Sequence, residues 1–142
     1  AEHMKLKFAF LSLIIITASL TAFAPAPTLQ LALLKYSGGG DWYNDVHSLR
    51  NLARFCNDNI GTNISEEYAT VEPGSPDIFN YPFVYMTGHG NVVFRADEAQ
   101  NLRTYLSGGG FLFINDDYGL DPFIRKEMKK VFLVLFFILI HT

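Results

Sequence analysis

The stretch LRTYLSGGGFLFINDDYG, residues 102–119, decides the fold of this chain. It opens in a helical pattern, which three glycines at 108–110 end because glycine readily adopts the conformations found after helices. Four apolar residues at 111–114 then have the length and composition of a buried strand. The strand leads into the polar segment NDDYG at 115–119. Helix, glycine break, apolar strand and polar loop, in that order, are typical of α/β proteins.

Upstream of this stretch, the chain predicts two further strands that lead into helices. Residues 83–87 (FVYMT) form a strand that ends at glycines and precedes a helix at 96–107. Residues 29–36 (LQLALLKY) form a first strand, which SGGG breaks before a helix at 46–59. The apolar face of that first helix is expected to point inward: Leu49, Leu52, Ala53, Cys56 and Ile60.

The remaining elements complete an alternating order. A weak strand is expected at 69–72, a short helical turn at 77–80 and a last helix at 122–131. This alternation predicts crossover helices around an open, mostly parallel sheet. Residues suited to helix ends support it: Asn44 or Asp45 as the cap of the first helix, Gly61 as its stop, and Pro122 in the first turn of the last helix.

The N-terminal segment is typical of an export signal. Residues 1–3 resemble a tag remnant, and residues 4–24 have the charged, apolar and small-residue regions of a secretory signal peptide. Pro25 follows the small residues directly, so two outcomes stay open, cleavage close to Ala22 or retention as an anchor. We therefore expect a periplasmic or otherwise exported single α/β domain at 25–142, which meets the membrane only through an uncleaved signal segment.

Ten consecutive apolar residues, 131–140, lie near the other end of the sequence. As a helix this run is too short to cross a bilayer. Two interpretations stay open: a strand of a parallel sheet, buried on both faces, or an out-of-frame tail that leaves the domain incomplete.

The net charge and the cysteine content exclude or disfavour several classes of function for this chain. A net charge of −3 gives no electrostatic reason to bind nucleic acid. Cys56 is the one cysteine, which excludes an intrachain disulfide and a metal site built from several thiolates. The glycine spacings of dinucleotide-binding and nucleoside-triphosphate-binding loops are both absent from residues 37–40. We expect no metal and no cofactor.

The candidate site follows from the rule that ligands of open α/β sheets bind beyond the carboxyl ends of the strands. Three loops are predicted to meet there: 37–45 (SGGGDWYND), 88–91 (GHGN) and 115–119 (NDDYG). Their acids, aromatic residues and glycines predict a polar crevice with aromatic walls. The candidate catalytic residues are His89, Asp116 and Asp117, and the candidate ligand-binding residues are Gly39, Gly40, Asp41, Trp42, Tyr43, Gly88, Gly90, Asn115 and Tyr118.

Four kinds of chemistry compete for this crevice. Phosphate binding is disfavoured because acids follow the glycines and would repel the anion. A hard divalent cation would find carboxylate ligands, but adjacent acids at a strand end more often form turns and helix caps. A nucleophile elbow would have to use Asn115 or Asp116. A sugar-like ligand would stack on Trp42 and Tyr43, although the plainer interpretation is that both rings pin their loop to the sheet.

Four segments in this order resemble the bacterial domain-of-unknown-function family 4159: LLKYSGGGDWYND (33–45), NYPFVYMTGHG (80–90), LRTYLSGGGFLFINDDYG (102–119) and IRKEMKKVF (124–132). That family is similar in fold to the class I glutamine amidotransferase-like superfamily. The resemblance implies an α/β three-layer sandwich with a mostly parallel, flavodoxin-like sheet. It implies no assigned activity.

The resemblance also argues against one chemistry. In that superfamily the turn after the strand at 111–114 carries a nucleophile, typically cysteine. The matching place here holds Asn115 or Asp116, which makes amidotransferase and cysteine-peptidase activities improbable. The chain also departs from the family pattern after Phe132, where similar proteins continue with a proline and further strands, as expected of a truncated domain.

The leading hypothesis is a non-catalytic binding or interaction module whose partner is a polar small molecule or a protein. One alternative is a hydrolase or metal-assisted enzyme that uses His89 with Asp116 or Asp117. Another is a truncated fragment without independent function. An enzyme predicts His89 within hydrogen-bond reach of an acid, and a binding module predicts that Trp42 or Tyr43 is open to the crevice.

Overall fold

The computed structural model describes residues 28–132. The signal segment expected at 4–24 lies outside these residues, as does all but the start of the apolar run at 131–140. Among the described residues, no helix has both the length and the apolar composition that a membrane span requires.

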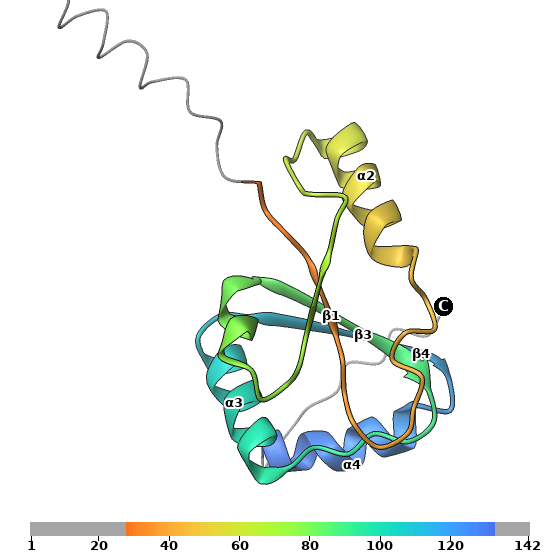
Figure 1. Ribbon diagram of the computed structural model, residues 1–142, viewed down its shortest axis with the longest axis vertical. Helices are drawn as coiled ribbons and strands as arrows, with labels where there is room; N and C mark the ends of the chain where they lie inside the picture. The colour runs from red at the N-terminus through yellow and green to blue at the C-terminus, as the bar shows by residue number, and fades with distance from the viewer. Residues whose placement is uncertain (1–27, 133–142) are drawn as a thin grey trace, which may run out of the picture.

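The four predicted strands at 29–36, 69–72, 83–87 and 111–114 form one parallel sheet. The strands β1 (Ala32–Leu34), β2 (Ala69–Val71), β3 (Phe83–His89) and β4 (Phe111–Tyr118) are arranged in the order β2-β1-β3-β4 (Figure 1). The predicted α/β class with a mostly parallel, flavodoxin-like sheet is therefore confirmed. Strand β4 is longer than the predicted 111–114 because its pairing with β3 continues into the polar residues.

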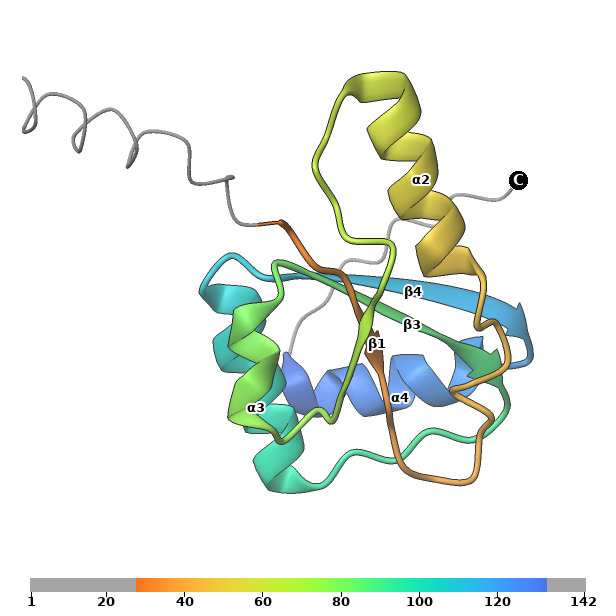
Figure 2. The same ribbon diagram turned by 45° about the horizontal axis from the view of Figure 1, so that its top comes forward.

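Helices cover both faces of the sheet. Helix α2 (Ser48–Ile60) lies on one face, while α3 (Ala96–Ser107) and α4 (Asp121–Val131) lie on the other (Figure 2). The chain steps from β1 to β2 in one direction and from β3 to β4 in the other. Right-handed crossovers therefore place α2 and α3 on opposite faces, which gives the expected three layers. The predicted helical turn is a 3-10 helix, η2 (Pro76–Asn80).

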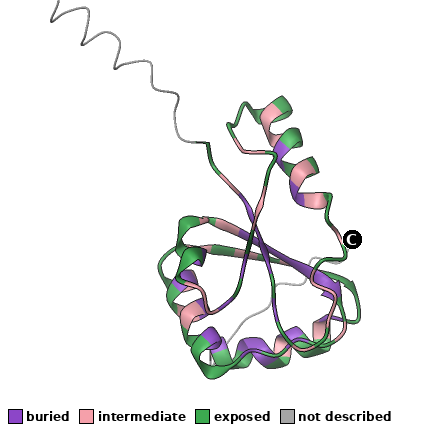
Figure 3. Cartoon of the chain, in the orientation of Figure 1, coloured by how far each residue is buried: buried purple, intermediate pink, exposed green. Residues whose placement is uncertain are grey.

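The main core lies between the sheet and the pair α3 and α4. Side chains from the strands meet side chains from both helices there, and the central strands are the most continuously buried part of the chain (Figure 3). Residues at helical spacing supply the helix side of this core: Ala99 and Leu102 of α3, and Ile124, Met128 and Val131 of α4, with Leu106 packed against them.

The opposite face of the sheet has a smaller core under α2. It consists of Leu31, Leu33, Leu49, Ala53 and Tyr85. The predicted inward positions of Leu52 and Ile60 are wrong, since both side chains are exposed. The C-terminal half of α2, which ends at Ile60, leaves the sheet (Figure 2), and Leu52 lines an open groove between α2 and the sheet.

The two ends of α2 give different outcomes for the predicted cap and the predicted stop. The Asp45 carboxylate accepts hydrogen bonds from the backbone N–H groups of His47 and Ser48. The N-cap residue is His47, however, and it has no capping side-chain hydrogen bond, so the predicted cap at Asn44 or Asp45 is wrong. Gly61 follows the helix with a φ of 68°, the left-handed conformation of a helix stop. The helix begins at Ser48 rather than at the predicted residue 46, and its first backbone hydrogen bond runs from the N–H of Asn51 to the carbonyl of His47.

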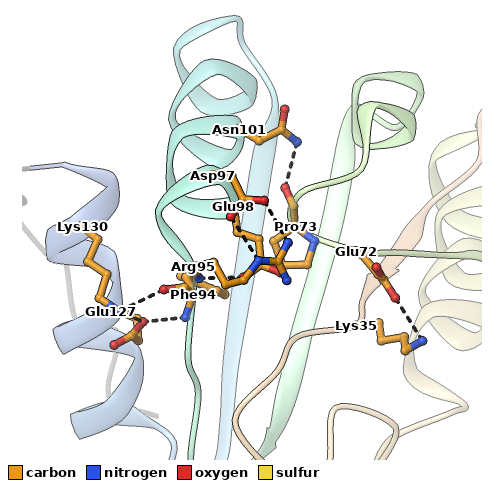
Figure 4. Close-up of polar contacts among 10 residues, drawn as sticks. All are labelled: Lys35, Glu72, Pro73, Phe94, Arg95, Asp97, Glu98, Asn101, Glu127 and Lys130. Atoms are coloured by element: carbon orange, nitrogen blue, oxygen red, sulfur yellow. Dashed lines mark hydrogen bonds and ion pairs between the residues drawn. The ribbon is translucent and has the colours of Figure 1, made fainter.

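Two buried carboxylates hold the segment between β3 and α3 (Figure 4). Glu98 accepts the backbone N–H of Arg95 at 2.7 Å and pairs with its guanidinium at 2.8 Å. Glu127 of α4 accepts the backbone N–H of Phe94 at 2.6 Å and an ammonium hydrogen bond from Lys130 at 2.6 Å. Each buried charge thus has a charged partner and a backbone partner, which offsets its desolvation.

Candidate functional site

The carboxyl ends of β1, β3 and β4 bring the three predicted loops together. Asp41 from the first loop accepts the backbone N–H of His89 on one carboxylate oxygen, and its other oxygen lies 2.9 Å from His89 Nδ1. A carboxylate that contacts both the main chain and the ring of one histidine fixes that ring in position. The residues of the pair are 48 positions apart in the sequence.

The other nitrogen of the imidazole faces the third loop. His89 Nε2 lies 3.4 Å from Asp117 Oδ2, and Asn44 Nδ2 donates a hydrogen bond to the same carboxylate oxygen. The imidazole therefore hydrogen-bonds Asp41 through Nδ1 and lies within ion-pair distance of Asp117 through Nε2. The three side chains therefore form a linear cluster, Asp41–His89–Asp117, which we call the acid–histidine cluster.

Gly88 allows the backbone to pass close to the first loop. Its φ of 136° is a conformation that L side chains rarely adopt, and a Cβ there would lie 2.4 Å from Tyr36 Oη and 3.0 Å from Asp41 Oδ1. Tyr36 in turn donates its hydroxyl to the carbonyl of Thr87 at 3.1 Å. The end of β3 is thus held by a buried tyrosine on one side and by Asp41 on the other.

Asp41 and Tyr36, which both lie against the end of β3, have shifted pKa values. The pKa of Asp41 is lowered, chiefly because its carboxylate accepts the backbone N–H of His89. The pKa of Tyr36 is raised to about 12, first by burial and second by the negative charge of Asp41. The site therefore favours an ionised Asp41 beside a neutral Tyr36.

Asp116 lies apart from the acid–histidine cluster. Its two carboxylate oxygens accept the backbone N–H groups of Leu120 at 2.7 Å and Asp121 at 3.1 Å, at the start of α4. Strand alternation explains the difference, because neighbouring residues of a strand point to opposite faces of a sheet. Of the two predicted acids, Asp117 meets His89, while Asp116 fixes the connection between β4 and α4.

The predicted aromatic residues differ in exposure. Tyr43 is 60% exposed and Tyr118 is 80% exposed, so both present ring surface to solvent. Trp42 is half-buried, contacts Tyr43 edge-to-face at 5.4 Å and packs against both cores. Trp42 thus anchors its loop, whereas Tyr43 and Tyr118 are free to contact a ligand.

The predicted glycines have two different roles. Gly40 lets the first two loops touch, because a Cβ there would lie 2.6 Å from the carbonyl oxygen of Asn91. Gly39 and Gly90 have positive φ values of 92° and 70°, and a Cβ at either would meet nothing within 4 Å. These two glycines shape their loops without making close contacts.

Sequence reasoning missed Tyr36, Asn44 and Thr87 as parts of the site. Asn44 stands inside the quoted segment SGGGDWYND, where it is expected to cap a helix or to hydrogen-bond a sugar-like ligand, and not to hold Asp117. The role of Tyr36 depends on the approach of β3 to β1, which no local pattern reveals. Asn115, a predicted ligand residue, lies 3.4 Å from Thr87 Oγ1 through its side-chain nitrogen.

Among residues 28–132, no group of three or more His, Cys, Asp or Glu side chains has an arrangement that could hold a metal ion. The acid–histidine cluster is linear, with the imidazole between the two carboxylates, rather than convergent on one point. The described carboxylates of this site are engaged in hydrogen bonds with the protein. What the arrangement can do is accept hydrogen bonds from a ligand and exchange a proton at His89.

The fold and site define a flavodoxin-like α/β domain with a polar cluster at the carboxyl ends of its strands. Within that class, the chain belongs to the family described as domain of unknown function DUF4159, whose match covers residues 30–134. The predicted resemblance is therefore confirmed. No curated protein matches the chain.

Proposed function

We propose that this domain is an exported binding module that holds a polar small molecule against the acid–histidine cluster. The observation that carries the proposal is the position of His89 between Asp41 and Asp117. The side chains of all three are between one third and one half exposed, so each can still reach a ligand.

Preorganisation supports binding at this place. Asp41 is held by two contacts with His89, and Asp117 by contacts with His89 and Asn44. Fixed acceptors lose little conformational entropy when a ligand donates hydrogen bonds to them. The exposed ring of Tyr43, in the same loop as Asp41, supplies apolar surface, as aromatic rings do in many small-molecule sites.

Export supports a binding role outside the cytoplasm. The segment at 4–24 has the layout of a secretory signal peptide. A mildly acidic surface and the absence of thiolate clusters in the sequence fit a soluble-ligand module better than a nucleic-acid or redox protein.

A hydrolase is the second candidate, because a histidine oriented by a carboxylate is the arrangement of a general base. His89 Nδ1 and Asp41 supply that pair at 2.9 Å. Its Nε2, however, faces Asp117 rather than a serine, threonine or cysteine, so an enzyme would have to activate water. Slow hydrolysis of p-nitrophenyl acetate that disappears in His89→Ala would support this candidate.

A thermal-shift panel of simple sugars, small amines and divalent cations tests the binding module. A ligand that binds the native state raises the melting temperature, by an amount that grows with its concentration. We expect a shift with at least one polar organic compound in the parent, and its loss in Asp117→Asn. Asp58→Asn on the outer side of α2 is the matched control and keeps the shift. A panel without any shift contradicts the proposal.

A further inference from the structure

Two rows of side chains run along the α2 face of the sheet toward the acid–histidine cluster. The β3 row is Phe83, Tyr85 and Thr87, and the β4 row is Phe111, Phe113 and Asn115, paired in that order by the strand register. Beyond a register shift between Gly88 and His89, the two strands carry His89 and Asp117, whose side chains lie 3.4 Å apart. Thr87 is fully buried, so the accessible surface changes from aromatic rings to the polar Asn115 and then to the charged side chains.

The aromatic part of this surface is the floor of an open groove. The rings of Phe83 and Phe111 stack at 5.4 Å, and those of Tyr85 and Phe113 at 5.9 Å. The groove has a volume of about 520 Å³, within the range of small-molecule sites. Its lining combines this floor with one side of α2: Ser48, Leu49, Leu52, Phe83, Tyr85, Phe111, Phe113 and Asn115.

The groove is open in the described residues. Phe111 is 55% exposed and Phe113 is 46% exposed. Contiguous apolar rings of this kind are uncommon on a protein surface unless they bind something. Asn115 and Ser48 line the groove, and beyond them the two strands carry His89 and Asp117.

The polar end carries negative charge. It holds two carboxylates, Asp41 and Asp117, against one histidine. The ion pairs that lysine and arginine side chains form within residues 28–132 join acids other than Asp41 and Asp117. A ligand that continues from the groove into the cluster is therefore favoured when its head is positively charged.

We propose that the groove and the cluster form one site for an amphipathic organic cation, with its ammonium head at Asp117 and its apolar chain over Phe113 and Tyr85. The proposal rests on the proposed binding function and names the ligand class for the same crevice. It commits to one occupant whose two ends match the two ends of the groove in polarity and charge.

Calorimetric titration of the full chain with primary alkylamines tests the apolar end. Butylamine, hexylamine and octylamine, all charged at pH 7, should bind with affinity that rises about fourfold for each methylene buried. The Phe113→Ser variant should flatten this dependence on chain length. The matched control is Phe123→Ser, a partly exposed ring on α4, which should leave the dependence unchanged.

Head-group exchange at constant chain length tests the charged end. Octylamine should bind at least tenfold more tightly than octanoate or octyl glucoside in the parent. In Asp117→Asn the preference over octyl glucoside should shrink, while the dependence on chain length is retained. Equal binding of all three heads would overturn the proposal.

The outcomes separate this inference from the function on which it rests. If short polar compounds bind and chain length has no effect, the binding module stands and the amphipathic site fails. If no amine and no sugar binds, both fail. If the parent is a dimer in sedimentation and Phe113→Ser makes it a monomer, a second copy covers the groove and the small-molecule proposal is overturned.

Discussion

His89 Nδ1 lies 2.9 Å from Asp41 Oδ2, and the backbone N–H of the same histidine donates to the other oxygen of that carboxylate. One side chain thus joins the loop after β1 to the end of β3. The contacts depend on a charged acceptor, since a protonated carboxyl accepts hydrogen bonds less strongly. The pair is therefore a structural element as well as part of the candidate site.

The lowered pKa of Asp41 predicts a contribution to acid stability. A carboxyl whose folded pKa lies below its unfolded value stabilises the fold above the unfolded value, and this stability is lost as pH falls through the folded pKa. We expect Asp41→Asn to be less stable than the parent near pH 7 and to lose less stability on acidification below about pH 4. Urea unfolding between pH 3 and 7 measures both.

Three other carboxyls also have lowered pKa values: Asp45, Glu66 and Asp97. Because they also stabilise the fold less at low pH, the Asp41→Asn variant should still lose part of its stability on acidification. The control is Asp58→Asn, which changes an exposed carboxylate of α2. Parallel pH profiles for Asp41→Asn and the parent would show that the contacts with His89 add no stability.

The raised pKa of Tyr36 predicts a separate loss of stability at high pH. Its folded pKa, about 12, lies above the ordinary value of 10.0, so its contribution to stability is complete below pH 10 and is lost as pH rises toward 12. Ultraviolet absorbance of tyrosinate should show a late step that is missing from Tyr36→Phe. Tyr105 also has a raised pKa, so Tyr105→Phe is the comparison that assigns the step.

Much of the fold could be predicted because its patterns are local. The apolar runs at 83–87 and 111–114, the glycines between elements and Pro122 each act on a few neighbouring residues, and all mark elements of the structure. The exposure of Leu52 and Ile60 could not be predicted, because periodicity reports a face of a helix but not whether a neighbour covers it. The tilt of α2 is a tertiary property.

The site could be predicted only in part for the same reason. The rule for open sheets placed Asp41, His89 and Asp117 in one region, and the structure brings these three into contact. The rule could not separate Asp116 from Asp117, since that depends on how far the strand alternation continues beyond residue 114. The aromatic groove was missed because its two rows become neighbours only through the register of β3 with β4.

The conformation and close contacts of Gly88 predict that a residue with a Cβ at this position destabilises the end of β3. Gly88→Ala adds a Cβ that would lie 2.4 Å from Tyr36 Oη at a φ of 136°. We expect a loss of about 1–3 kcal/mol from the strained backbone alone, with a further loss from the contact. Gly90→Ala is the matched control, because its positive φ of 70° carries a backbone cost while its Cβ meets nothing within 4 Å. Equal losses in chemical denaturation would show that the approach of Tyr36 is unimportant.

The contacts of Glu127 predict that this one buried carboxylate contributes to stability by holding α4 against the segment before α3. In Glu127→Ala the backbone N–H of Phe94 loses its acceptor at 2.6 Å, and Lys130 loses its ion pair. An unpaired buried N–H costs about 1–3 kcal/mol, and the cavity adds to that cost. We therefore expect the free energy of unfolding to fall by at least about 2 kcal/mol.

Two further variants separate charge from packing at this position. Glu127→Gln keeps an oxygen that can accept the N–H of Phe94 but removes the charge that pairs with Lys130. We expect it to lie between the parent and Glu127→Ala. Lys126→Ala on the exposed side of α4 should change stability by less than about 0.5 kcal/mol. If Glu127→Gln is as stable as the parent, the N–H acceptor is the essential feature, and the ion pair with the half-exposed Lys130 contributes little.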